Sequence, residues 1–134
     1  MVENQVVKEV LSKEMIRAGA ELTRLLDDSG LTVSASFWLF LPESNMWRLI
    51  IASQEVDEHG PRRVYEKIQS VLQGTHQKAK AITLAEISAV DSNDKWVSVL
   101  RKAIRTGHGV SGTRFSRNTI DGHFIEDAYI YRIT

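Results

Sequence analysis

The chain has 134 residues, which fits one domain and is too short for two of ordinary size. It contains no cysteine, which excludes a disulfide framework, a thiolate zinc site and a cysteine nucleophile. The net charge is zero, but residues 1–59 carry 5 basic and 10 acidic side chains, whereas residues 60–120 carry 11 basic and 4 acidic. This segregation indicates an anionic partner for the middle segment, unless folding interleaves the two segments into a mixed surface.

The N-terminal residues and the apolar runs indicate a cytoplasmic protein. The chain begins without the basic start and apolar stretch of a signal peptide. The longest purely apolar run, residues 37–41, is far shorter than the roughly 18 residues that cross a bilayer. We therefore expect a cytoplasmic location and no contact with a membrane.

The first part of the chain predicts a helix followed by a β-hairpin. Residues 6–28 show helical apolar spacing, which Asp28-Ser29-Gly30 ends. Residues 31–41 alternate as a strand, and after a turn that starts at Pro42 residues 47–53 return as its partner. The partner contains an apolar run without alternation, which predicts a strand covered on both faces.

The second part predicts two more helices with a short strand between them. A helix starts at Pro61 and ends at Gly74, and a short strand follows around residues 82–87. Residues 91–94 offer several N-caps for a third helix, which Gly107 closes.

The chain ends in a hairpin around the two-residue turn Asp121-Gly122. Counting back from this turn predicts the cross-strand pairs Arg114–Tyr129, Phe115–Ala128 and Arg117–Glu126.

The element order α-β-β-α-β-α-β-β predicts the α+β class. We expect residues 1–134 to form one domain, a single-layer mixed five-stranded sheet packed with three helices. The order of the strands in the sheet stays open.

A glycine-rich loop in the basic segment 101–117 is the main candidate for binding. Residues 107–112 match G-x-G-x-x-G, but they follow a helix and open a strand, the reverse of a nucleotide-binding loop. Arginine holds phosphate by two parallel hydrogen bonds, and glycine amides can approach an anion closely. The candidate anion-binding residues are therefore Arg105, His108, Gly109, Arg114 and Arg117.

The alternative interpretation is structural. The glycines then only shape the loop, and the arginines are solvated or paired with Glu126 and Asp127. His108 is a candidate acid or base because imidazole titrates near neutral pH.

We expect no metal and no cofactor. The four histidines lack ligand spacing, and Glu126 and Asp127 are neighbours on a strand, so they point to opposite faces.

Trp38, Phe40 and Trp47 form an apolar second face on the first hairpin. They either lie in the core beneath helix 6–28 or form an exposed patch that serves as an interface.

Two stretches carry a resemblance to other proteins. Residues 47–53 with Gly60-Pro61-Arg62, and residues 115–118 with 124–131, resemble a group of uncharacterised small bacterial proteins. The resemblance implies a prokaryotic cytosolic protein and supplies no activity.

Three functions stay open. The first, which we favour, is a non-enzymatic binding or interaction module, for example a regulatory one, that self-associates or engages an anionic or protein partner. The second is a small enzyme on a phosphate-bearing substrate, with His108 as acid or base and Arg105, Arg114 and Arg117 as the clamp. The third is a structural homodimer joined through Trp38 and Phe40. A nucleic acid as the anion has little support, because the net charge is zero and no nucleic-acid-binding signature is present.

Overall fold

The computed structural model describes residues 7–74 and 81–134. The strands are β1 (Val33–Leu41), β2 (Met46–Ser53), β3 (Ile87–Val90), β4 (Thr113–Ile120) and β5 (His123–Ile133). The helices are α1 (Lys13–Asp28), α2 (Gln54–His59), α3 (Arg62–Gln73), the short 3-10 helix η2 (Leu84–Glu86) and α4 (Lys95–Arg101). The predicted α+β fold is confirmed, and α2 is an addition to the three predicted α-helices.

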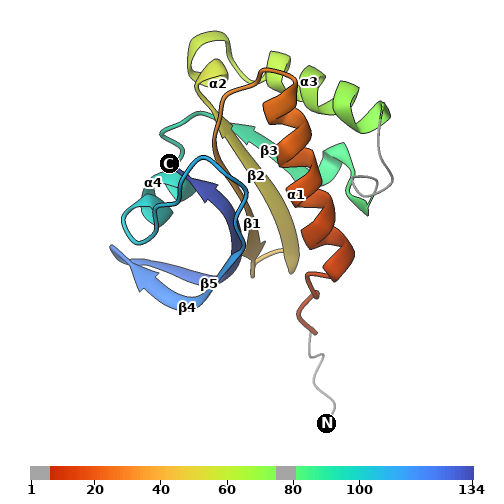
Figure 1. Cartoon of the computed structure of the whole chain (residues 1–134). Helices are drawn as coiled ribbons and strands as arrows, with labels where there is room; N and C mark the ends of the chain where they lie inside the picture. Colours follow the sequence, from red (N-terminus) through yellow and green to blue (C-terminus); the bar gives the residue numbers. More distant parts are fainter. Residues whose placement is uncertain (1–6, 75–80) are drawn as a thin grey trace.

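The five strands form one mixed sheet in the order β3-β2-β1-β5-β4 (Figure 1). The β2–β3 pair is parallel because α2 and α3 carry the chain across between them, and the other pairs are antiparallel. The last strand therefore inserts beside the first and occupies an interior position in the sheet.

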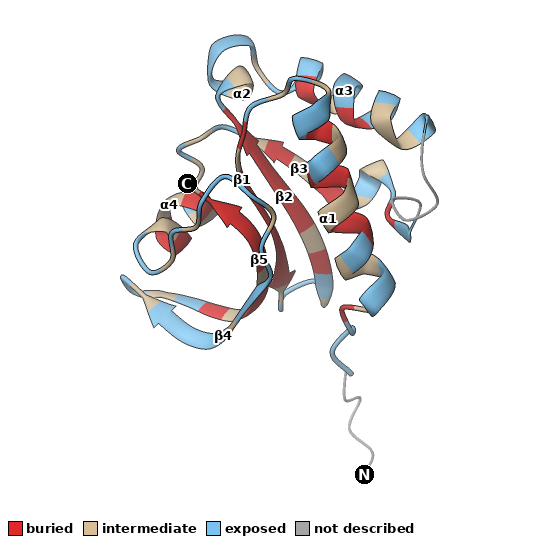
Figure 2. Ribbon diagram, in the orientation of Figure 1, coloured by how far each residue is buried: buried red, intermediate tan, exposed pale blue. Residues whose placement is uncertain are grey.

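Helices cover both faces of the sheet (Figure 2). Leu22 of α1 and Val64 of α3 belong to one core layer, and Val97 and Leu100 of α4 belong to the layer on the other face. Strand β2 is buried on both faces from Leu49 onward, as its unbroken apolar run predicted.

Helix α1 is shorter than predicted at its N-terminus. It begins at Lys13, after Ser12 caps it by accepting a 3.1 Å hydrogen bond from the Met15 amide. The predicted start at residue 6 is wrong, because residues 7–9 bond to the first hairpin instead. The Glu9 amide donates to Asn45, and the Glu9 carbonyl accepts from the Trp47 indole.

Two predicted boundaries in the second half are also wrong. The strand expected at 82–87 is β3 at 87–90, because Thr83 and Glu86 form a capping box that folds residues 84–86 as η2. The helix expected to close at Gly107 ends at Arg101. Residues 102–112, here the 102–112 loop, run beside β5 instead, where the Thr106 amide donates to the Ile133 carbonyl at 2.7 Å.

The final hairpin has the predicted register. Asp121 and Gly122 both have positive φ, as a two-residue turn of this kind requires. The pairs Arg114–Tyr129 and Phe115–Ala128 are confirmed. Arg117 lies at an irregularity with φ 50°, and its side chain approaches Glu126 to 3.9 Å.

Candidate functional site

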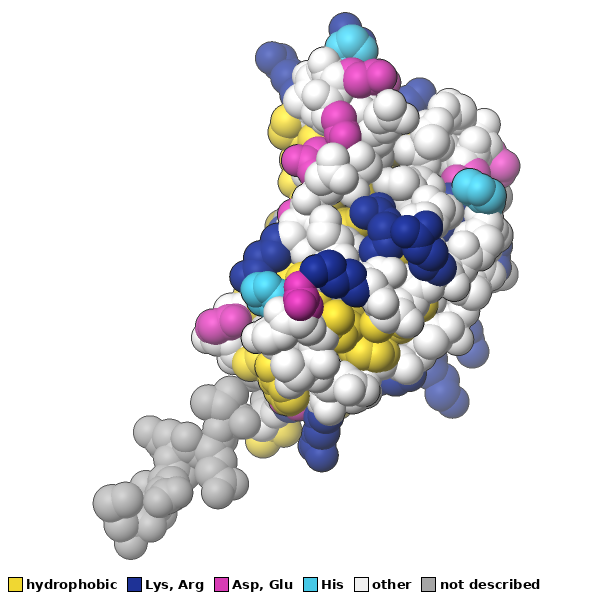
Figure 3. All heavy atoms as spheres, turned by 90° about the vertical axis from the view of Figure 1, so that its left-hand side faces the viewer, with side chains coloured by type: hydrophobic (Ala, Val, Ile, Leu, Met, Phe, Trp, Pro, Cys, Tyr) yellow, Lys and Arg dark blue, Asp and Glu magenta, His cyan; other side chains and the backbone are white. Residues whose placement is uncertain are grey.

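Two of the arginines predicted to form an anion site are paired with carboxylates, and the third follows helix α4. The Arg114 guanidinium donates two hydrogen bonds to the Asp127 carboxylate, at 2.8 and 2.7 Å, and Arg117 lies 3.9 Å from Glu126. Arg105 follows α4, which covers the other face of the sheet. Figure 3, which views the side that carries α4, shows basic side chains in small groups separated by acidic, apolar and uncharged surface. These contacts argue against a single anion site in segment 101–117.

The Asp127 carboxylate accepts hydrogen bonds from the basic side chains near the final hairpin. Besides Arg114, it accepts hydrogen bonds from Lys8 at 2.7 Å and from Ser116 at 3.1 Å. Burial raises the pKa of the Asp127 carboxyl, but the hydrogen bonds from Arg114 and Lys8 outweigh it and lower the pKa to about 2. Both cations also lie over the Trp47 ring, each 5.6 Å from a ring centroid. The arrangement is a neutralised cluster that leaves little charge for a ligand.

His108 lines a different hollow of about 350 Å³, and the carbonyl of the neighbouring Gly109 accepts a hydrogen bond from Arg132. Arg132 also lines this hollow, but it is 3% exposed and holds Asp27 through two hydrogen bonds of 2.9 and 2.7 Å. Two further Arg132 donors reach the carbonyls of Gly109 and Val33, so four of its five N–H groups are used. Because this guanidinium is already engaged in this way, it is not available to clamp a phosphate next to His108.

Trp38, Phe40 and Trp47 lie in the core rather than on an exposed patch. They are 0%, 5% and 4% exposed and belong to the layer beneath α1 and α3. The interpretation of these residues as an exposed interface is therefore wrong for the folded chain.

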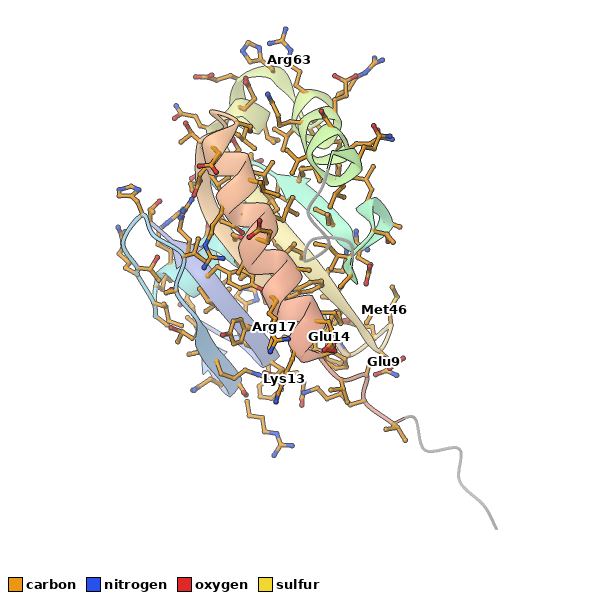
Figure 4. The ribbon with its side chains drawn as sticks, turned by 45° about the vertical axis from the view of Figure 1, so that its right-hand side comes forward. Glu9, Lys13, Glu14, Arg17, Met46 and Arg63 are labelled. Atoms are coloured by element: carbon orange, nitrogen blue, oxygen red, sulfur yellow. The ribbon has the colours of Figure 1, made fainter. Side chains whose placement is uncertain are left out.

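An open groove of about 280 Å³ lies between α1 and the 102–112 loop. It is lined by Ile16, Arg17, Ala20, Arg24, Val110, Ser111, Gly112, Tyr129 and Tyr131. We call it the α1–loop groove. In Figure 4, Arg17 and Lys13 project from the same side of α1.

The two arginines of this groove are less neutralised than those of segment 101–117. The Arg17 side chain has no hydrogen bond or ion pair within residues 7–74 and 81–134. Within the same residues, the Arg24 side chain has only Glu21 at 3.9 Å, and it is 57% exposed. Exposed pairs of this kind contribute little, so both guanidinium groups are able to bind an anion.

Two tyrosines of β5 form the floor of the groove, and hydrogen bonds hold the hydroxyl of one of them in place. The Tyr131 hydroxyl accepts from the Trp38 indole at 3.0 Å and donates to the Ile16 carbonyl at 2.5 Å. Burial raises the pKa of the Tyr131 phenol, so it stays protonated. Tyr129 packs edge-on against Tyr131, with ring centroids 5.5 Å apart, and among the described residues its hydroxyl has no hydrogen-bond partner.

The loop wall of the groove is held in place by hydrogen bonds to β5. The Ser111 amide and hydroxyl both donate to the Tyr131 carbonyl at 2.8 Å. A Cβ at Gly112 would collide with the Tyr129 hydroxyl and lie 3.1 Å from the ring carbon that bears it, so glycine permits the close approach of loop and ring. Sequence reasoning missed this groove because Arg17 and Arg24 lie in the acidic first half of the chain. Their seven-residue spacing, which puts them on one line of a helix, was the available signal.

The other hollows of the described residues are less suited to a ligand. One of about 290 Å³ lies at the end of α1 where Figure 4 shows Glu9 and Met46, and Glu86 also lines it. The Glu86 carboxylate already accepts hydrogen bonds from the amide and the hydroxyl of Thr83. On α2, Glu55, Glu58 and His59 bring ligand atoms within 4.8 Å of one another, but all three side chains are at least partly exposed and we assign no metal to them.

Comparison with protein-family models, with curated proteins and with solved structures found no match to this chain. The resemblance to small bacterial proteins, and the cytoplasmic location, therefore stay predictions. None of the helices in the described ranges has the length and apolar character needed to cross a bilayer.

Proposed function

We propose that the protein is a non-enzymatic binding module whose α1–loop groove takes a small anionic ligand with an apolar body. The observation that carries the proposal is the pair Arg17 and Arg24. Both arginines line one groove, and among the described residues neither forms an ion pair with a carboxylate closer than 3.9 Å.

The remaining walls of the groove explain why the ligand has an apolar body. Ile16, Ala20 and Val110 offer only aliphatic surface, and the two tyrosine rings add aromatic surface. Pockets that bind small molecules combine such apolar walls with a few polar groups that fix orientation. Here those groups are the guanidinium groups and the Tyr129 hydroxyl, which no described residue engages in a hydrogen bond.

Binding is proposed rather than catalysis because of the titratable groups that line the groove. The arginines stay charged and so do not exchange protons with a substrate. The Tyr131 hydroxyl is buried and already holds hydrogen bonds to Trp38 and to the Ile16 carbonyl. His108, the candidate acid or base, lines a separate hollow.

The test is a titration followed by two-dimensional NMR, with octanoate and phenyl phosphate as probes. We expect amide shifts confined to residues 16–24, 110–112 and 129–131, with affinity that falls as salt rises. The double variant Arg17→Gln with Arg24→Gln should weaken binding roughly tenfold or more, since it removes the charge-assisted hydrogen bonds of both guanidinium groups.

Arg63→Gln is the matched control. Arg63 is an exposed arginine on α3, and Figure 4 shows it at the opposite end of the molecule from Arg17. If neither probe shifts the groove residues, or if Arg63→Gln weakens binding as much as the groove variants, the proposed function is wrong.

A further inference from the structure

The spacing of the two groove arginines carries information about the shape of the ligand. Arg17 and Arg24 are separated by seven residues of α1, which is almost two full turns. They therefore lie on one line along the helix, about 10 Å apart at the backbone. The positive charges mark the two ends of the helical wall.

The stretch of wall between the arginines is apolar and is not suited to an anion. Ala20 lies between them and lines the groove with a small apolar side chain. Glu21 adjoins Ala20 on the helix, and its carboxylate lies 3.9 Å from Arg24, so an anionic group at that end competes with it for the guanidinium group. A single anionic group placed midway would meet the apolar surface of Ala20, so the spacing of the charges favours one anionic group at each end.

The facing wall adds one apolar and one polar group. Val110 supplies aliphatic surface across the groove, and Tyr129 brings a hydroxyl that has no hydrogen-bond partner among the described residues. From these observations, and resting on the proposed function, we propose that the ligand is a linear dicarboxylate. One carboxylate binds Arg17, the other binds Arg24, and the methylene chain lies over Ala20.

The experiment is calorimetric titration of the full chain with straight-chain dicarboxylates from succinate to dodecanedioate, with octanoate as the monocarboxylate control. We expect affinity to pass through a maximum near suberate to sebacate, the lengths that span the two arginines. Suberate should bind roughly tenfold or more tightly than octanoate, because the second carboxylate gains its own charge-assisted hydrogen bonds.

The arginine variants then assign the two ends. Arg17→Gln and Arg24→Gln should each reduce suberate affinity to that of octanoate and remove the length maximum, whereas Arg63→Gln should leave both unchanged. Monomethyl suberate, which has lost one charge, should bind the unmodified protein like octanoate.

The outcomes separate this inference from the proposed function. If octanoate and all dicarboxylates bind equally and the groove variants weaken them equally, the groove binds one anionic group and the two-ended ligand is wrong. If no carboxylate binds and phenyl phosphate also leaves the groove amides unshifted, the proposed function fails with it.

Discussion

Gly19 is a residue at which α1 lies directly against side chains of the sheet. A Cβ at this position would collide with the Tyr131 hydroxyl and would lie 2.8 Å from the Trp38 indole nitrogen. Both side chains are buried, so they have little room to move away. The absence of a side chain at Gly19 therefore lets α1 lie on the hydrogen bond between Trp38 and Tyr131.

We expect Gly19→Ala to destabilise the protein by about 1–3 kcal/mol, the usual cost of overpacking a core. The measurement is urea unfolding followed by tryptophan fluorescence. Gly107→Ala is the control, because no atom lies within 4 Å of the added Cβ and the backbone is not in the left-handed region. Equal stability of Gly19→Ala and the unmodified protein would contradict the close approach.

The Asp127 cluster predicts a specific dependence of stability on pH. The folded pKa of Asp127 is about 2, below the ordinary value of 3.8. The carboxylate therefore stabilises the fold fully above about pH 4, and this contribution is lost as the pH falls toward 2. It amounts to something on the order of 2 kcal/mol.

The comparison is the free energy of unfolding of the unmodified protein and of Asp127→Asn between pH 2 and pH 7. We expect the variant to be less stable at neutral pH and the difference to shrink as the pH falls through this window. A difference that does not change with pH would show that the carboxylate charge is not what stabilises the hairpin.

The residue pairs of this region were only partly predictable. The Arg114–Tyr129 pair follows from the turn, because a two-residue turn fixes the register of both strands. The contacts of Asp127 did not follow, since Lys8 comes from a segment 119 residues away. Only the folded chain brings these charges together.

At the scale of elements, Arg132 fixes the 102–112 loop to the rest of the molecule. Its guanidinium joins Asp27 at the end of α1, the Val33 carbonyl at the start of β1 and the Gly109 carbonyl in the loop. The loop forms one wall of the α1–loop groove. The position of that wall therefore depends on a buried cation.

We expect Asp27→Asn to cost about 3 kcal/mol, because it leaves Arg132 buried without its anionic partner. The double variant Asp27→Asn with Arg132→Met should be more stable than the sum of the two single changes predicts. The measurement is a double-mutant cycle by denaturant unfolding, and additive effects would contradict a direct interaction.

The elements divide into those set by local sequence and those set by tertiary contacts. The first hairpin and the end of α1 at Ser29 were predictable, because apolar period and turn residues act over a few positions. The N-terminal start of α1 and the end of α4 were not. Residues 7–9 bond to the first hairpin, and Thr106 bonds to Ile133, so distant partners decide both boundaries.

At the scale of the whole molecule, the pairing of basic side chains predicts poor binding to nucleic acid. Non-specific affinity grows with the number of phosphates that cations neutralise. Arg114 and Arg117 face carboxylates, and Arg101 donates to backbone carbonyls. Few of the basic groups in segment 101–117 are left to contact phosphates.

We expect fluorescence anisotropy with labelled duplex DNA at low salt to show no saturation below about 100 µM protein. A known basic DNA-binding domain serves as the positive control for the assay. Tight binding that weakens steeply with salt would mean that the arginines rearrange onto one surface.

The strand order and the α1–loop groove are the properties that sequence reasoning could not reach. Both depend on β5 lying beside β1. This pairing brings together residues far apart in the chain, such as Trp38 and Tyr131, which are 93 positions apart and share a side-chain hydrogen bond. Local patterns carry no information on which strands become neighbours at such separations. The groove arginines were missed for a related reason, because the net charge of the first half of the chain is negative and gives no sign of a local basic site.

The interior position of β5 has a consequence for synthesis of the protein. A ribosome makes this strand after every other element of the domain, and until residues 123–133 emerge, β1 has one open edge and β4 has no neighbour. Nascent chains therefore hold an unpaired apolar edge for most of translation, which invites association with other chains or capture by chaperones. A premature stop codon a few codons into β5 would leave a product that lacks the strand joining β1 to β4.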